Sequence, residues 1–110
     1  MTPINLEVLV VTIAKLSEAV KANQLVGFDA GPAGVDEPVM GVAKYAAEAG
    51  QPVAVIVQGL VELTAATNIA AGDYLYSNVD GRPTDAGTNH PFGIAFQGGA
   101  AGDVISVLLK

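Results

Sequence analysis

The feature of this chain that most restricts its fold is a repeated, glycine-punctuated pattern of short apolar runs. Gly41–Ala43 is followed by Ala49–Val55, and Gly93–Ala95 is followed by Ala101–Val107. Positions 41 and 50 therefore match positions 93 and 102 at a constant offset of 52 residues. An internal match at a fixed offset indicates that one structural unit occurs twice in the chain.

A weaker match extends the repetition toward the N-terminus. Residues 20–26 resemble residues 69–75 at an offset of 49 residues. The difference of three residues between the two offsets falls in the loops between the matched segments, where insertions cost little free energy. We therefore predict one β domain over residues 1–110, with pseudo-repeats at approximately 4–58 and 53–110.

Runs of β-branched residues bounded by Gly, Pro or Asp predict the strands. Two runs are long and five are short: Ile4–Ile13, Pro52–Leu63, Gln24–Phe28, Val39–Ala43, Asp73–Ser77, Phe92–Phe96 and Asp103–Leu109. Lys15–Lys21 has the composition for one or two helical turns. We predict an all-β fold, a small β-barrel or sandwich built from two pseudo-repeated β units, with at most one or two short helical turns.

The composition permits only a thin core. Hydrophobic residues make up 51% of the 110 residues, but the chain has three Phe, three Tyr and no Trp. Small side chains bury little area each, and at about 25 cal/mol per Å² this limits the stability of a monomer. The chain also has no Cys for disulfides or thiolate metal sites. Association of several copies is a common remedy, so we expect a homo-oligomer.

The charge balance excludes several classes of partner. Eleven acidic residues against five basic ones give a net charge of −6, and an acidic surface repels nucleic acid. Met1–Glu7 lacks the basic region of a signal peptide, and the longest apolar run, Val8–Ala14, is too short to cross a bilayer. We expect a soluble protein with no nucleic-acid or membrane partner.

The sequence shows no group of residues with the pattern of a catalytic or metal site. His90 is the single histidine, and Asp36-Glu37 is the single adjacent carboxylate pair, within a Gly/Pro-rich loop. Catalysis or metal binding requires converging partners for such groups. Gly98–Gly102 precedes a strand and not a helix, so we interpret it as a hairpin turn and not as a phosphate-binding loop. We predict no enzyme activity, no cofactor, no metal and no small-molecule substrate.

Two other function classes stay open from the residues alone. Tyr45, Tyr74 and Tyr76 are candidates for an aromatic ligand face, which would make the chain a small ligand- or carbohydrate-binding β module. Tyr74 and Tyr76 would share one face of a strand, where a subunit contact explains them equally well. The chain is also compatible with an accessory subunit whose partner holds the active site.

The order of the short motifs resembles one known family over nearly the whole chain. The motifs are Val26–Asp29, Gly41–Ala43, Ala49–Val55, Ile69–Tyr76, Asp80-Gly81, Gly93–Ala95 and Ala101–Leu109. This order is similar to that of the capsid decoration or cement proteins of tailed phages, a DUF2190-type family. The resemblance implies a compact β-barrel-like subunit, a homotrimer, on the outer capsid surface of the virion. It implies assembly in the host cytoplasm and a role in stabilising the expanded head by bridging major capsid proteins.

The family supplies no motif for the residues that contact the capsid, so these are predicted from physical reasoning. The first candidate is an N-terminal arm that adds to the edge of a capsid sheet through main-chain hydrogen bonds. It consists of Thr2, Pro3, Ile4, Asn5 and Leu6. The second is the exposed Gly/Pro-rich loop that contains Val35, Asp36 and Glu37.

Overall fold

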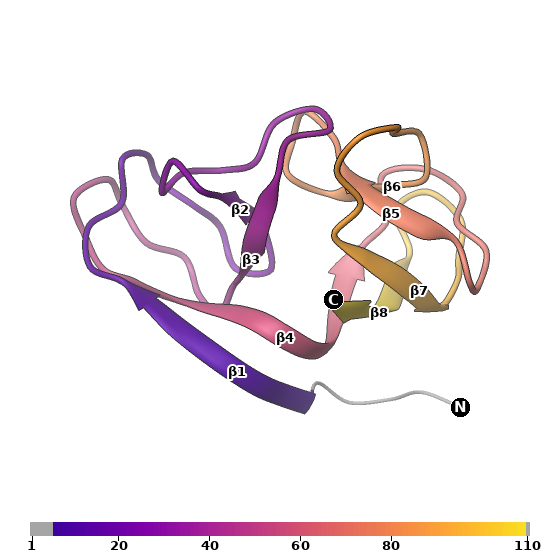
Figure 1. The fold of residues 1–110 in the computed structure, drawn as a ribbon, viewed down its shortest axis with the longest axis horizontal. Helices are drawn as coiled ribbons and strands as arrows, with labels where there is room; N and C mark the ends of the chain where they lie inside the picture. The colour runs from indigo at the N-terminus through magenta and orange to yellow at the C-terminus, as the bar shows by residue number, and fades with distance from the viewer. Residues whose placement is uncertain (1–5, 110) are drawn as a thin grey trace.

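A computed structural model of the chain describes residues 6–109, and within this range it contains strands and no helix (Figure 1). The strands are β1 (Leu6–Ile13), β2 (Leu25–Gly27), β3 (Val39–Ala43), β4 (Val53–Thr64), β5 (Tyr74–Ser77), β6 (Pro83–Thr84), β7 (Gly93–Gln97) and β8 (Val104–Leu109). The prediction of an all-β chain is confirmed, and the seven predicted strands correspond to all of these except β6.

β4 is the central strand because it pairs with three others. β1 and β3 both pair with Val55 and Ile56, and β1 and β8 both pair with residues 59 and 60. A strand has two edges, so β1 occupies one edge while β3 and β8 follow one another along the opposite edge. The 12 residues of β4 thus belong to both halves of the molecule.

The antiparallel sheet curls into a nearly closed, barrel-like shape. Its order is β2-β3-β4-β8-β7-β5-β6, with β1 paired to β4 outside this path. Figure 1 shows β2 and β3 above one part of β4, and β5 to β8 gathered at its other end. β6 consists only of Pro83 and Thr84, which pair with β5, and two residues are too few to produce a strand pattern in a sequence.

The predicted helical turns over Lys15–Lys21 do not form. The Leu16 amide instead donates to the Gln51 carbonyl at 3.0 Å, and the Ser17 amide donates to the Ala30 carbonyl at 2.9 Å. Val20 forms an isolated bridge with Ala47. Each of these bonds joins distant parts of the chain, so tertiary pairing satisfies the backbone groups that a helix would have paired locally.

The two halves of the molecule use the same backbone hydrogen bonds. The Leu16 amide donates to the Gln51 carbonyl, and the Ala65 amide donates to the Asp103 carbonyl, at offsets of 49 and 52 residues. In the same way, the Val20–Ala47 bridge matches a bridge between Ile69 and Gly99. A structural unit that occurs twice in the chain would produce this agreement.

The core consists of two clusters of small apolar side chains. The larger one contains Leu25, Ala33, Val42, Ile56, Val61, Leu63, Ala65, Ile69, Leu75, Phe92, Ala95, Ile105, Val107 and Leu109. The smaller one contains Leu16, Val20, Val26, Ala43, Val53 and Val55. Strands approach closely over this thin core, and at Gly41 an added Cβ would overlap the carbonyl oxygen of Ile56.

Candidate functional site

The predicted N-terminal arm lies mostly outside the described residues. Thr2, Pro3, Ile4 and Asn5 precede the described range. Leu6 is the first residue of β1, and its backbone pairs with Leu60 of β4. Residue 6 therefore belongs to the sheet, and any arm that extends from the body ends at Asn5.

The second predicted contact site is held together by Asp36, whose carboxylate binds the backbone of another loop. Its Oδ2 accepts the amides of Thr88 at 3.1 Å and Asn89 at 3.0 Å, together with the Thr88 hydroxyl at 3.3 Å. Its Oδ1 accepts the His90 amide at 3.0 Å. Asp36 thus joins the loop before β3 to the loop before β7.

The backbone of Asp36 takes part in the same junction. Its amide donates to the Ser77 carbonyl at 2.8 Å, and its carbonyl oxygen lies 2.8 Å from His90 Nδ1. Asp36 adopts a φ of 50°, in the left-handed region where Asn and Asp are the more frequent residues besides Gly. The single histidine therefore has a structural contact within a loop.

The hydrogen bonds from the His90 and Thr88 amides lower the pKa of the Asp36 carboxyl below its ordinary value. These donors favour the charged form, so the carboxylate is the form that closes the junction. The residues on either side of Asp36 differ from it. Val35 is 66% exposed, and the exposed Glu37 carboxylate accepts the Gly34 amide within its own loop. The structure therefore presents Val35 and Glu37 outward and uses Asp36 internally.

The three tyrosines do not form one ligand face. The Tyr45 hydroxyl accepts the Ala54 amide at 3.2 Å, which ties this residue to the start of β4. Tyr74 and Tyr76 lie on β5 and line a shallow depression with Asp73 and Asp85, which Tyr45 does not join. Gly87 packs so closely on Tyr76 that an added Cβ would overlap the ring.

The glycine-rich segment before β8 is a tight turn. Gly102 has a φ of 90°, in the left-handed region that favours glycine. At Gly98 an added Cβ would overlap the Ile69 carbonyl oxygen, so this glycine permits close backbone approach. Within residues 6–109 no group of three His, Asp or Glu residues has the arrangement of a metal site.

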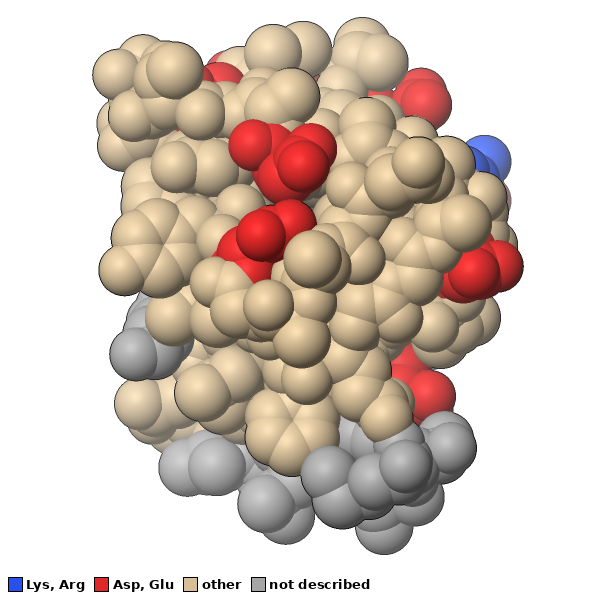
Figure 2. All heavy atoms as spheres, turned by 90° about the vertical axis from the view of Figure 1, so that its right-hand side faces the viewer, with Lys and Arg blue, Asp and Glu red and all other residues tan. Residues whose placement is uncertain are grey.

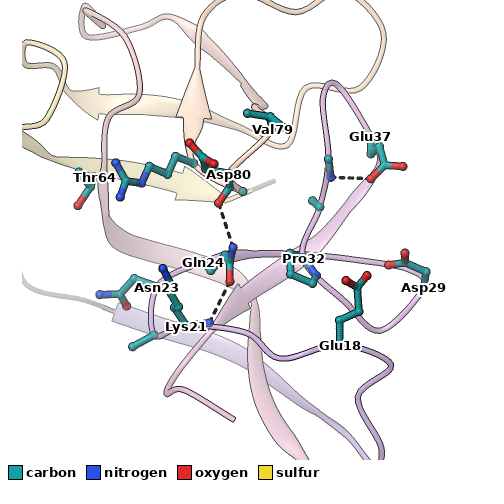
Figure 3. Close-up of a pocket in the computed structure, with 15 residues that line it drawn as sticks. Glu18, Lys21, Asn23, Gln24, Asp29, Pro32, Glu37, Thr64, Val79 and Asp80 are labelled. Carbon is teal, nitrogen blue, oxygen red and sulfur yellow. Dashed lines mark hydrogen bonds between the residues drawn. The ribbon is translucent and has the colours of Figure 1, made fainter. Parts of the chain in front are cut away.

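A polar groove of about 720 Å³ runs between the two halves of the molecule (Figure 3). Gln24 spans it: its Oε1 accepts the Lys21 amide at 2.9 Å, and its Nε2 donates to the Asp80 carbonyl at 3.0 Å. Glu18 and Arg82 add charges of both signs to the lining. The groove is therefore a hydrogen-bonded junction between the halves, and its open, mixed lining favours no ligand of one charge.

Several apolar side chains on the sheet are exposed, and of the following three only Tyr74 was singled out from the sequence. They include Val11 on β1, Tyr74 on β5 and Leu108 on β8, which are 40%, 60% and 41% exposed. The period-two alternation of these strands was a usable signal, but a strand sequence alone does not tell which face is covered. Figure 2 shows the side of the molecule that carries β5 to β7, where acidic side chains gather in the upper part and basic ones appear only at the edge.

In the described part of the chain, no helix has the length and apolar character needed to cross a bilayer.

Comparison with known proteins gives the same fold and a family. The structure is similar to that of the head fiber gp8.5 N base in bacteriophage phi29, with a TM-score of 0.73 and 20% sequence identity. The match covers 93% of this chain and 95% of that chain. No curated protein sequence matches the chain. The model of the phage cement protein family matches residues 5–110. The chain therefore belongs to the phage cement protein family.

Proposed function

We propose that this protein binds the exterior of the expanded phage head as a homotrimer and bridges neighbouring major capsid proteins. The observation that carries the proposal is the family match over residues 5–110. The fold supports it, because Asp36 and the single histidine, His90, which are the candidates for a chemical role, form hydrogen bonds that join two loops. In this proposal the chain acts by binding the capsid and not by catalysing a reaction.

Stabilisation of the head follows from mass action. A protein that binds only the expanded shell lowers the free energy of that state by its binding free energy. A trimer that contacts several capsid proteins at once gains affinity because each later contact forms at a high effective concentration. The alternative role as a carbohydrate-binding module lacks a shared tyrosine face in this structure.

Cosedimentation with purified heads tests the proposal. We expect the protein to pellet with expanded heads that lack decoration, and to remain in the supernatant with procapsids or with heads of an unrelated phage. Decorated heads should also withstand higher temperature before they release DNA. Equal binding to all three particles, or binding to none, would contradict the proposal.

Capsid binding through the N-terminal arm is the more specific part of the proposal. Deletion of residues 1–5 leaves Leu6 at the start of β1 and keeps the pairing of β1 with β4. We expect this variant to keep its melting temperature but to bind expanded heads at least tenfold more weakly. The matched control is Val79→Ser, because Val79 is 71% exposed in a turn outside both predicted contact sites. Val35→Ser in the exposed loop separately tests the second predicted contact site. If deletion unfolds the protein, residues 1–5 belong to the fold and the arm proposal is wrong.

A further inference from the structure

We infer that copies of this chain associate head to tail, through a contact that repeats the contact between the two halves of one chain. The inference deepens the proposed homotrimer and assigns its interface. It uses two units: a first unit of residues 6–58, with β1, β2, β3 and the start of β4, and a second unit of residues 59–109, with the end of β4, β5, β7 and β8.

The strand register equates the residues of the two units one by one. In the first unit Leu25 pairs with Val42, and Val42 pairs with Ile56. In the second unit Tyr74 pairs with Ile94, and Ile94 pairs with Leu108. Each set forms a row across three strands, on the face opposite to the core of its own unit. We call them the first row (Leu25, Val42, Ile56) and the second row (Tyr74, Ile94, Leu108).

The first row is completely covered, although it faces away from its own unit. Leu25 and Val42 are 0% exposed and Ile56 is 2% exposed. All three belong to the larger cluster, whose other members come mostly from the second unit. We call the core-facing side chains of a unit its inner layer. The first row therefore covers the inner layer of the second unit.

The second row has no cover among the residues that the structure describes. Tyr74 is 60% exposed, Leu108 is 41% exposed and Ile94 is only partly buried. These residues occupy the positions that Leu25, Ile56 and Val42 hold in the first unit. An apolar row that is buried in one unit is thus left open in the other.

Part of the inner layer of the first unit is likewise less buried than its equivalent in the second unit. Val11 pairs with Val55 as Val61 pairs with Val107, yet Val11 is 40% exposed whereas Val61 is 1% exposed. The same holds for three further equivalent pairs, in which the first member is only partly buried and the second belongs to the larger core cluster. They are Ile13 and Leu63, Met40 and Phe92, and Val57 and Leu109.

The exposed second row, and the partly exposed group of Val11, Ile13, Met40 and Val57 at the border of the buried inner layer, thus correspond to two groups that already pack together inside the chain. The second row of one copy has the position and apolar character to cover the inner layer of the first unit in the next copy. The two groups cannot meet within one chain, because β4 joins the units so that the first row already packs on the inner layer of the second unit. The occupant of each face is therefore a second copy. A contact between unlike faces forms a ring when its rotation closes and an open filament when it does not, and the proposed homotrimer corresponds to the closed ring.

Substitutions on the two faces test this interface. Leu108→Glu places a charge in the second row, and Val11→Glu places one on the inner layer of the first unit. Val79→Glu is the matched control, because Val79 is 71% exposed in a turn outside both faces. We expect sedimentation velocity to show a trimer for the unsubstituted protein and for the control. Each interface variant should sediment as a monomer of about one third of that mass.

Mixing the two interface variants separates a head-to-tail contact from other contacts. Each variant keeps the face that the other has lost, so an equimolar mixture should form a dimer and nothing larger. Circular dichroism shows whether the variants fold, and Tyr74→Asp provides a second variant of the row. A monomeric unsubstituted protein, in which residues 1–5 cover the row themselves, would overturn the inference. Interface variants that behave like Val79→Glu would overturn it as well.

The same variants distinguish this inference from the proposed function. If the capsid proposal is correct and the interface is wrong, Leu108→Glu binds expanded heads as well as the unsubstituted protein does. If the interface is correct and the capsid proposal is wrong, the variant becomes monomeric and the unsubstituted trimer binds no head.

Discussion

At the scale of single residues, Asp36 shows how one acidic side chain can organise a loop surface. A carboxylate that accepts several backbone amides replaces the water that would otherwise solvate them. Asp36 does this for the amides of Thr88, Asn89 and His90, residues more than 50 positions away in the sequence. The shape of the loop surface around Val35 therefore depends on one ionised group.

The pH dependence of stability should reveal this role of Asp36. Its pKa is lower in the folded state, so its stabilising contribution is full above the unfolded pKa of about 4 and is lost as the pH falls through the folded pKa. We expect Asp36→Asn to lower the melting temperature by several degrees at pH 7, and the difference to shrink below pH ~4. Asp80→Asn, in an exposed turn, is the control and should change the melting temperature little. An equal difference at pH 3 and pH 7 would contradict the assignment.

At the scale of elements, β4 is the strand on which the architecture depends, because both units share it. The sequence predicted β4 as one long run and placed its ends within one residue, since β-branched residues and glycines mark them clearly. The predicted start of the first strand at Ile4 lies outside the described residues, and β1 begins at Leu6. The sequence did not predict β6 or the absence of helical turns over Lys15–Lys21, because tertiary hydrogen bonds decide both. The spacing of short motifs predicts an internal repetition, which stays a prediction, and the covered face of each strand could not be predicted from the sequence.

Two glycine substitutions distinguish close strand packing from a turn requirement. In Gly41→Ala the new Cβ would overlap the Ile56 carbonyl oxygen on β4, so we expect a loss of about 2–3 kcal/mol in the free energy of unfolding. In Gly50→Ala the Cβ meets open space, and only the φ of 85° is unfavourable, at a cost of about 1 kcal/mol. Urea denaturation measures both. A larger loss for Gly50→Ala would show that the β3–β4 approach can relax.

The equivalent glycine of the second unit gives an independent check. At Gly93 an added Cβ would lie 2.6 Å from the Leu108 carbonyl oxygen on β8. Gly93→Ala should therefore destabilise the protein by an amount similar to Gly41→Ala, again about 2–3 kcal/mol. A much smaller effect at Gly93 would mean that β7 and β8 separate more easily than β3 and β4, and that the two units are not mechanically equivalent.

At the scale of the whole molecule, the core is thin and several apolar side chains of the sheet are exposed, so we expect stability to depend on the inferred association of copies. The buried residues are mostly Val, Leu, Ile and Ala, and Phe92 is the single buried aromatic residue of the core. Of the functional surfaces, the sequence could indicate loops and termini from composition. It could not indicate the exposed rows, because Leu25 and Tyr74 occupy equivalent positions and only the tertiary structure shows which one is covered.

Melting temperature should therefore depend on protein concentration. Association stabilises the folded state by mass action, so we expect the melting temperature to rise over a hundredfold range of concentration. For Leu108→Glu the melting temperature should be lower and independent of concentration. Differential scanning fluorimetry or calorimetry measures both. A constant melting temperature for the unsubstituted protein, together with a monomeric mass, would show that the core suffices for one chain alone.

The pairing of unlike faces has a consequence for how such an assembly meets a shell. Rotation about a closed ring axis carries each copy onto the next without turning it over, so the start of β1 emerges on the same side of every copy. Every copy therefore presents the start of β1 in the same orientation relative to the ring axis. The two sides of such a ring differ. A shell that recognises the chain beginnings therefore binds the ring in only one orientation.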